Sequence, residues 1–380
     1  KEGDFDEEGI VKMFMKAGEY PGCSATRKIN DNINDLRAQV SANQKGIRLV
    51  QALFEEFGKG FVQFYMAAIR NNAEQAVREF FRDMHRVHGG KALHAVDYFD
   101  DGIPVKLSIT FDGEAGEATF DFTGTGPEEY GPMNAPASIT ASCVMYVVRC
   151  LIDLDIPLNQ GCLVPCHIVI PKGTILNPIG DVAICGSTIS GQRITDTILK
   201  CFGVAAASQG DANSFGWGRG GKDPYTGKVL PGFATGEALG GGVGAMEGYR
   251  GASACNVHCT NTKTTDIEIV ETRTPVLVTK WSIRRGSGGR GKWYGGDGAT
   301  REIQALVPLR VSIISERRIY HPYGIMGGES GDCGSNYWFR KMPDGTYLKI
   351  HMNAKEIIYV NTGDRVQINT PGGGGYGKAE

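Results

Sequence analysis

One short stretch, residues 257–266, concentrates polar side chains without the spacing of a helix or a strand. An imidazole such as His258 can act as a general base or as a metal ligand. The amide of Asn261 can donate a hydrogen bond to an oxyanion, and the carboxylate of Asp266 can orient a base. We therefore take His258, Asn261 and Asp266 as catalytic candidates. The alternative is a hydrogen-bonded turn in which threonine and asparagine side chains satisfy the backbone.

Two arginines are candidates for binding a substrate carboxylate. Arg317 follows a predicted strand in the sequence Glu-Arg-Arg, and Arg193 lies in a predicted helix behind the polar residues from Ser187 onward. A guanidinium group can hold a carboxylate through two parallel hydrogen bonds. We assign Arg193, Arg317 and Ser187 to substrate binding. The alternatives are an ion-paired strand end for Arg317 and a helix cap for Ser187.

Thiols and imidazoles cluster twice, in Cys255-x-x-His258-Cys259 and in the segment 162–167, which holds two cysteines and a histidine. Four such ligands can bind zinc, but neither spacing is that of a standard zinc knuckle. Alternate residues of a strand also point to opposite faces, which separates neighbouring ligands. Buried free cysteine is the preferred interpretation.

The glycine-rich sequence at 286–291 fits the pattern G-x-G-x-x-G. A dinucleotide site needs a helix to begin directly after such a loop, and the following residues 292–298 cannot begin one. The sequence G-x-x-x-x-G-K-[ST] is also absent, so no ATP site of that type is predicted. Two interpretations stay open: tight turns that require glycine, or backbone N–H groups that bind an anion or a partner subunit with Arg284, Arg285 and Arg290.

Hydrophobic periodicity predicts the elements that position these residues. Apolar residues at spacings of three, four and seven predict a helix from about residue 32 to 57 and a second from about 61 to 87. Glycines at 58 and 60 separate the two, so we expect an αα-hairpin. Strict alternation then predicts a β-hairpin over 105–122.

Shorter elements fill the rest of the chain. We expect a helix at 138–154, strands near 163–169 and 174–176, a helix near 195–207, a glycine-rich loop over 208–253, and short strands from 267 onward. The predicted class is α+β, with an N-terminal helical hairpin over 1–95, a central mixed α/β region over 96–265 and a β-rich, glycine-rich C-terminal unit over 266–380.

Composition narrows the partners and the location. The chain is 41% hydrophobic with a formal net charge of −2, which gives no reason to expect nucleic acid or a membrane surface as a partner. The longest apolar run, 141–152, carries Arg149 and is shorter than the ~20 residues that span a bilayer. Ten scattered cysteines predict reduced thiols in the cytoplasm. The acidic start without methionine indicates no signal peptide and suggests part of a longer polypeptide.

Several stretches, in order along the chain, together resemble the hydantoinase B/5-oxoprolinase family. They include Asp-Phe-Thr-Gly-Thr-Gly-Pro at 121–127, Pro-Leu-Asn-Gln-Gly-Cys at 157–162 and Thr-Asn-Thr at 260–262. The others are 34–43, 134–136, 285–291, 295–298, 316–318 and the final glycine run at 370–377. The resemblance covers almost the whole chain from about residue 25, and the residues of these motifs are most similar to those of the oxoprolinase branch.

This resemblance implies an ATP-dependent hydrolase of cyclic amides, with 5-oxoproline opened to glutamate in glutathione metabolism. An A-type half, as a separate subunit or a fused domain, would bind ATP and Mg²⁺ and activate the lactam. The B-type half would support hydrolysis within a homo- or hetero-oligomer. Ligands for a divalent metal would lie upstream of this chain. The alternatives are a catalytically silent scaffold or assembly module and a relative of the acetone and acetophenone carboxylases.

Overall fold

The computed structural model describes residues 3–20, 25–222, 229–258 and 260–379, and these form an α+β fold, as predicted. The helices are α1 (Glu7–Met15), η1 (Lys16–Glu19), α2 (Ile29–Phe57), α3 (Lys59–His88), α4 (Ala137–Leu151), η2 (Gln160–Leu163), α5 (Ser187–Phe202) and α6 (Ile267–Arg273). The strands are β1 (Leu93–Tyr98), β2 (Pro104–Asp112), β3 (Glu117–Asp121), β4 (Cys166–Val169), β5 (Ser214–Lys222), β6 (Val229–Ala238), β7 (Val276–Arg284), β8 (Gly298–Ala305), β9 (Leu309–Ile314), β10 (Ser335–Lys341), β11 (Tyr347–Met352), β12 (Lys355–Val360) and β13 (Arg365–Asn369). No helix in the described part is both long and apolar enough to cross a membrane.

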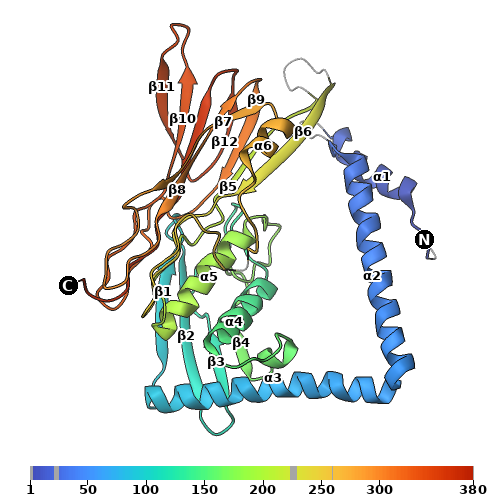
Figure 1. Ribbon diagram of the computed structural model, residues 1–380, viewed down its shortest axis with the longest axis vertical. Helices are drawn as coiled ribbons and strands as arrows, with labels where there is room; N and C mark the ends of the chain where they lie inside the picture. Colours follow the sequence, from blue (N-terminus) through green and yellow to red (C-terminus); the bar gives the residue numbers. More distant parts are fainter. Residues whose placement is uncertain (1–2, 21–24, 223–228, 259, 380) are drawn as a thin grey trace.

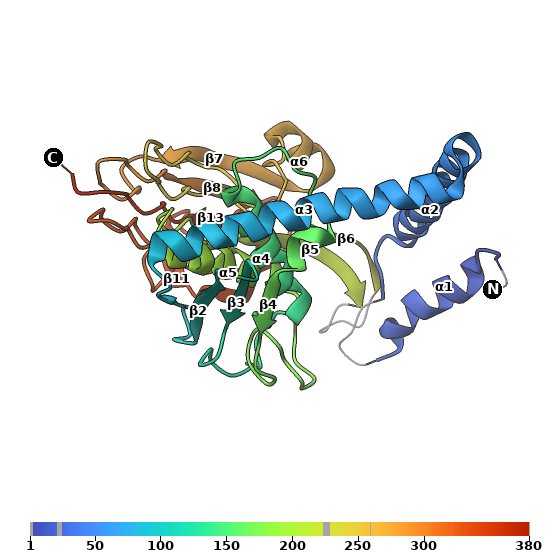
Figure 2. The ribbon, with the colours of Figure 1, turned by 90° about the horizontal axis from the view of Figure 1, so that it is seen from below.

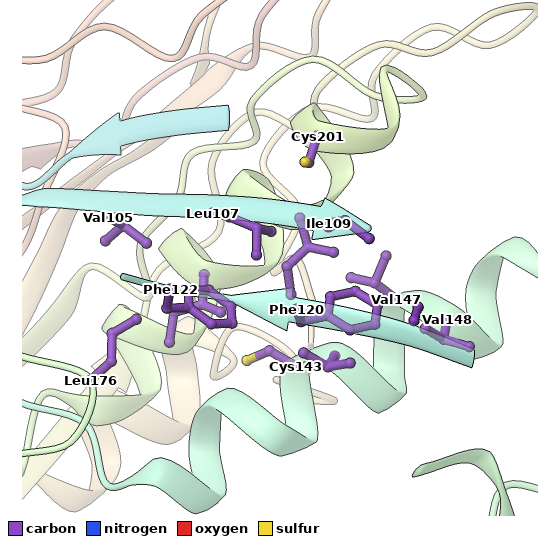
Figure 3. Close-up of a cluster of buried hydrophobic side chains, with 14 of the residues drawn as sticks. Val105, Leu107, Ile109, Phe120, Phe122, Cys143, Val147, Val148, Leu176 and Cys201 are labelled. Carbon is purple, nitrogen blue, oxygen red and sulfur yellow. The ribbon is translucent and has the colours of Figure 1, made fainter. Parts of the chain in front are cut away.

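The central unit is a four-stranded sheet in the order β1-β2-β3-β4, with α4 and α5 packed together on the sheet (Figure 1). The alternation of β2 and β3 places Leu107, Ile109 and Phe120 on one buried face. Figure 3 shows these side chains beside Val147 of α4. The predicted β-hairpin over 105–122 is therefore present, and its apolar face forms the core beneath α5.

A second core lies between the other two sheets. One has the order β11-β10-β13-β8-β7 and the other β12-β9-β5-β6. Side chains from both sheets, Phe215, Trp217, Ile303, Val311 and Val366 among them, form one buried cluster, as expected for a β-sandwich. The second sheet pairs β5 with β9, so strands from both sides of residue 266 share one sheet.

Glycine-rich segments far apart in the sequence lie side by side and pack backbone against backbone. The final run donates from Gly373 N to Gly296 O at 2.8 Å and from Gly374 N to Ala207 O at 2.8 Å. A Cβ added at Gly373 would lie 2.1 Å from the carbonyl oxygen of Val243, so no side chain fits there. We call the segments 240–245, 286–298, 323–331 and 371–377 the glycine layers. Many of their N–H groups donate to carbonyl oxygens of another of these segments.

The two long N-terminal helices begin and end close to the predicted residues, but they do not run antiparallel. α2 and α3 meet at a corner, and only α3 runs along the central unit (Figures 1 and 2). Gly58 alone separates them, at φ +84°, whereas an antiparallel pair needs a loop of 2–5 residues. As a result, apolar side chains of α2 such as Ile47 and Leu53 are exposed.

Several shorter predictions were wrong. The helix expected near 195–207 begins earlier, at Ser187, and ends at Phe202. The loop expected over 208–253 contains β5 and β6, and the region expected to hold short strands from 267 onward begins with the helix α6. In the segment 174–176, Thr174 forms isolated bridges and the other two residues lie in a turn, so there is no strand. The strands β5 and β6 contain several glycines, and α6 and the segment 174–176 are short, so no clear hydrophobic period is visible in them.

Candidate functional site

The helix α5 is buried on nearly all sides even though many of its residues are polar. Gln192, Arg193, Thr195 and Asp196 are each at most 2% exposed. A helix buried all round is usually apolar, because each buried polar group needs a hydrogen-bond partner. Polar partners for α5 must therefore come from the elements around it, and they come from the ends of β1 and β9 and from the loops that follow β6 and α5.

Two buried arginines link α5 to β1 and to the loop after β9. Arg317 donates to both carboxylate oxygens of Asp97, at 3.1 and 2.8 Å, and lies 3.4 Å from Asp196 Oδ2. Arg193 contacts Glu316 at 3.2 Å and Asp97 at 3.5 Å. Burial alone would lower the pKa of Arg317, but Asp97 and Asp196 raise it above its ordinary value. Both guanidinium groups are thus bound by carboxylates of this chain.

The loop that carries Arg317 is fixed by two further carboxylates. Asp100, just after β1, accepts from the backbone N–H of Arg318 at 2.8 Å and of Ile319 at 3.0 Å. Asp211 accepts from the N–H of Glu316 at 2.7 Å and from the Arg318 guanidinium at 3.1 Å. Because both ends of the loop are held, Arg317 keeps the left-handed φ of 60°, which is costly for a residue other than glycine.

His258 faces the buried carboxylate of Asp196. Its Nε2 lies 3.2 Å from Asp196 Oδ1, and its side chain is 14% exposed while that of Asp196 is fully buried. Asp196 also accepts from Ser208 N and Ser208 Oγ, each at 3.1 Å. Burial acts to raise the pKa of Asp196, but the hydrogen bond to His258 and the charge of Arg317 outweigh it, so the pKa is lowered. Asp196 is therefore an ionised carboxylate that orients an imidazole.

The backbone around His258 is held in an unusual conformation. His258 has φ 31°, a value that residues other than glycine rarely adopt. The Gln192 side chain donates to the carbonyl oxygens of Val257 at 2.9 Å and His258 at 2.5 Å. The Thr260 hydroxyl donates to the His258 carbonyl at 3.0 Å. These contacts stabilise the backbone that directs the imidazole toward Asp196 on one side and Tyr146 on the other.

The predicted site residues separate into two groups. His258, Arg193 and Arg317 come together through Asp97 and Asp196, which the sequence analysis did not select. The other three predicted residues do not join them. Asn261 is exposed, Asp266 is exposed and caps α6 by accepting from Glu268 N at 2.9 Å, and Ser187 begins α5 at its far end from Asp196.

The missed residues are Asp97, Asp196, Tyr146 and Gln192. The sequence did contain one indication for Asp196. It lies three residues after Arg193, and in a buried helix two such charged side chains would each need a polar partner. Asp97 lies in a strand that reads as half-exposed, and nothing in the sequence pairs it with residue 317. Tyr146 lies in an apolar helix, where an aromatic residue is usually part of the core.

The described residues contain no group of three or more His, Cys, Asp and Glu side chains arranged to hold a metal ion. His167 points away from the two nearby cysteines to Glu117, at 2.7 Å, and His258 is occupied by Asp196. Cys259 lies outside the described residues. The described residues of the two cysteine–histidine segments therefore do not form the zinc site considered from the sequence. The metal ligands that the family resemblance implies upstream of this chain stay a prediction.

An imidazole oriented by a buried, ionised carboxylate is the arrangement of a general acid–base site. The family model of Hydantoinase B/oxoprolinase matches residues 1–379, so the chain belongs to that family. A 5-oxoprolinase of the fungus Pestalotiopsis fici, PfmaA, is 56% identical over 379 residues. The match covers all of this chain and 30% of that relative, so the chain spans less than a third of its length.

Solved structures share the fold. An ATP-dependent caprolactamase from Pseudomonas jessenii superposes with a TM-score of 0.81 at 20% identity, over 99% of this chain and 65% of that one. A nucleotide-free acetone carboxylase superposes with a TM-score of 0.73 at 18% identity, over 87% of this chain and 50% of that one. At these identities the likeness concerns the fold alone, and the fold is common to a lactam hydrolase and a carboxylase.

Proposed function

We propose that this chain is the hydrolytic, B-type part of an ATP-dependent cyclic-amide hydrolase, with 5-oxoproline as the substrate and glutamate as the product. The observation that carries the proposal is the 56% identity to a 5-oxoprolinase over the entire chain. The fold shared with a caprolactamase is compatible with it. The acetone carboxylase fold is equally compatible, and the sequence relationship favours the hydrolase.

In this proposal ATP is bound by an A-type half, as a separate subunit or a fused domain. Phosphorylation of the lactam oxygen there converts a poor electrophile into an activated imidate that water can attack. The task of the present chain is then to remove a proton from that water. We assign this proton removal to His258, because Asp196 orients its imidazole. General base catalysis of this kind typically contributes ~10²–10⁴-fold in rate.

We propose a role for the buried arginines other than the predicted binding of a substrate carboxylate. Arg193 and Arg317 are fully buried and engaged by carboxylates of this chain, so a substrate carboxylate would first have to displace Asp97 or Glu316. We propose that they keep Asp196 ionised and in place. Ser187, Asn261 and Asp266 remain predictions for substrate contact or catalysis, as do a divalent metal bound by upstream residues, an oligomeric assembly and a cytoplasmic location.

The test is the release of ADP and the formation of glutamate that depend on 5-oxoproline. The chain is assayed alone and mixed with an ATP-binding A-type half, and folding of each sample is confirmed by circular dichroism. Glutamate formed only in the mixture supports the proposal and places ATP in the other half. If neither the chain alone nor the mixture forms glutamate, although both samples are folded, 5-oxoproline hydrolysis is overturned. That result favours the scaffold alternative or another lactam as the substrate.

A further inference from the structure

The imidazole of His258 has a second neighbour besides Asp196. The hydroxyl of Tyr146, on α4, lies 3.4 Å from His258 Nδ1, and the two rings meet edge to face at a centroid distance of 5.8 Å. Asp196 is fully buried, His258 is 14% exposed and Tyr146 is partly exposed. The three side chains thus form a hydrogen-bonded line that runs from the interior toward the surface.

The ionised carboxylate decides which nitrogen carries the proton of a neutral His258. A carboxylate can only accept a hydrogen bond, so Nε2, which faces Asp196, must donate. Nδ1 is then the nitrogen with the free electron pair, and it accepts from the Tyr146 hydroxyl. The basic nitrogen of the site therefore faces the tyrosine, and a water molecule on the outer side of Tyr146 would meet the phenol before the imidazole.

We propose that Tyr146 is a catalytic residue that relays the proton from the attacking water to His258. The inference rests on the proposed hydrolysis of an activated cyclic amide. As the water oxygen bonds to the imidate carbon, the C=N π bond breaks and its electron pair moves to the ring nitrogen. One water O–H bond breaks at the same time, and its proton goes to the Tyr146 oxygen. The Tyr146 hydroxyl proton passes at the same time to His258 Nδ1, which leaves an imidazolium beside the Asp196 carboxylate. Charge and protons balance without a further reactant.

The surroundings of Tyr146 agree with this role. Cys150, one turn further along α4, is hydrogen-bonded to Tyr146. Partial burial raises the pKa of the Cys150 thiol, so this neighbour of Tyr146 is a neutral thiol at pH 7. Arg149, the nearest cation along α4, is turned away and donates to the carbonyl oxygen of Ile156 at 3.0 Å.

A test independent of turnover is ¹⁵N NMR of the histidine side chains in the full chain. The sequence has seven histidines, and the signals of His258 are identified by their loss in His258→Gln. We expect the Nε2–H tautomer in the wild type and a shift of the Nδ1 resonance in Tyr146→Phe, which removes the hydroxyl and keeps the ring. Tyr337→Phe, on β10, is the matched control and leaves the signal in place. An Nδ1–H tautomer, or no shift in Tyr146→Phe, overturns the relay.

The second test uses the complete enzyme, with the A-type half present and 5-oxoproline as substrate. Tyr146→Phe is expected to lower kcat by ~10²-fold, the lower end of the range for acid–base catalysis. Since relay members act as a unit, the double variant with His258→Gln should lose no more than either single variant. Multiplied losses would contradict the relay while leaving the hydrolase assignment intact. Inactivity of the wild type with the expected NMR signature would overturn the assignment of function alone.

Discussion

Two regions of this molecule exclude water in opposite ways. Around α5, charged side chains are buried in mutual contact, and Arg317 holds Asp97 through two hydrogen bonds. In the glycine layers, segments distant in sequence approach so closely that no side chain fits between them, and backbone N–H groups satisfy backbone carbonyls. The packing of the first region depends on which charged side chains are present. The packing of the second depends on glycines, which have no side chain.

The two regions meet at the loop that follows α5. Ala207 donates to Tyr323 O at 3.0 Å and accepts from Gly374 N at 2.8 Å, so it is hydrogen-bonded to two of the glycine layers. The next residue, Ser208, bonds both oxygens of Asp196. The glycine layers therefore position one of the groups that hold Asp196 in place, and the geometry at His258 depends on both regions.

The largest effect is expected in the charged region. Arg317→Met leaves Asp97 and Asp196 buried beside an uncharged side chain, and loss of one partner of a buried ion pair costs about 3–5 kcal/mol of unfolding free energy. Urea unfolding followed by circular dichroism measures it. Arg37→Met removes a solvent-exposed pair with Glu7 and should change little. Equal effects of the two variants would contradict the account of the buried network.

Gly373→Ala tests the glycine layers. Its Cβ would lie 2.1 Å from the Val243 carbonyl oxygen, so the backbone must move, at a cost of about 3 kcal/mol for severe overpacking. The control is Gly345→Ala, where nothing lies within 4 Å but φ is +84°, so only the conformational strain of about 1–2 kcal/mol applies. The same unfolding experiment serves both variants. A control as unstable as Gly373→Ala would mean that conformation, and not close packing, requires the glycines.

A smaller, pH-dependent effect is expected for Asp196→Asn, about 2 kcal/mol for a buried hydrogen-bonded group at neutral pH. The pKa of Asp196 is lowered in the folded chain, so the ionised form stabilises the fold above the ordinary aspartate value of 3.8. That contribution is lost as the pH falls through the lower folded value. The difference in unfolding free energy between wild type and variant should therefore shrink below about pH 4. A difference independent of pH would contradict an ionised Asp196.

Much of the fold was predictable where hydrophobic periodicity is strong. The β-hairpin ending at Phe122 and the helix α4 were found because their apolar residues repeat at regular spacing. The starting point of α5 was missed because its buried face includes Gln192, Arg193 and Asp196. Buried polar residues are not visible in a hydrophobic pattern, and the first two turns of α5 contain only Ile189 and Ile194 as large apolar residues.

The site was predictable only in part for a related reason. His258 was selected by its residue type, but its partner Asp196 lies 62 residues earlier, and Asp97 lies 220 residues before Arg317. Such pairs are set by how elements pack, and sequence spacing does not contain that information. Asn261 and Asp266 were selected by proximity to His258 along the chain, and the chain carries them out to the surface instead.

The most direct measurement of the central claim is the rate of glutamate formation from 5-oxoproline and ATP by the complete enzyme carrying His258→Gln. The matched control is His351→Gln, on the exposed face of β11. If His258 is the general base, glutamate formation falls by ~10²-fold or more in the first variant while the control keeps the wild-type rate. A wild-type rate in His258→Gln would contradict the assignment of this site to hydrolysis.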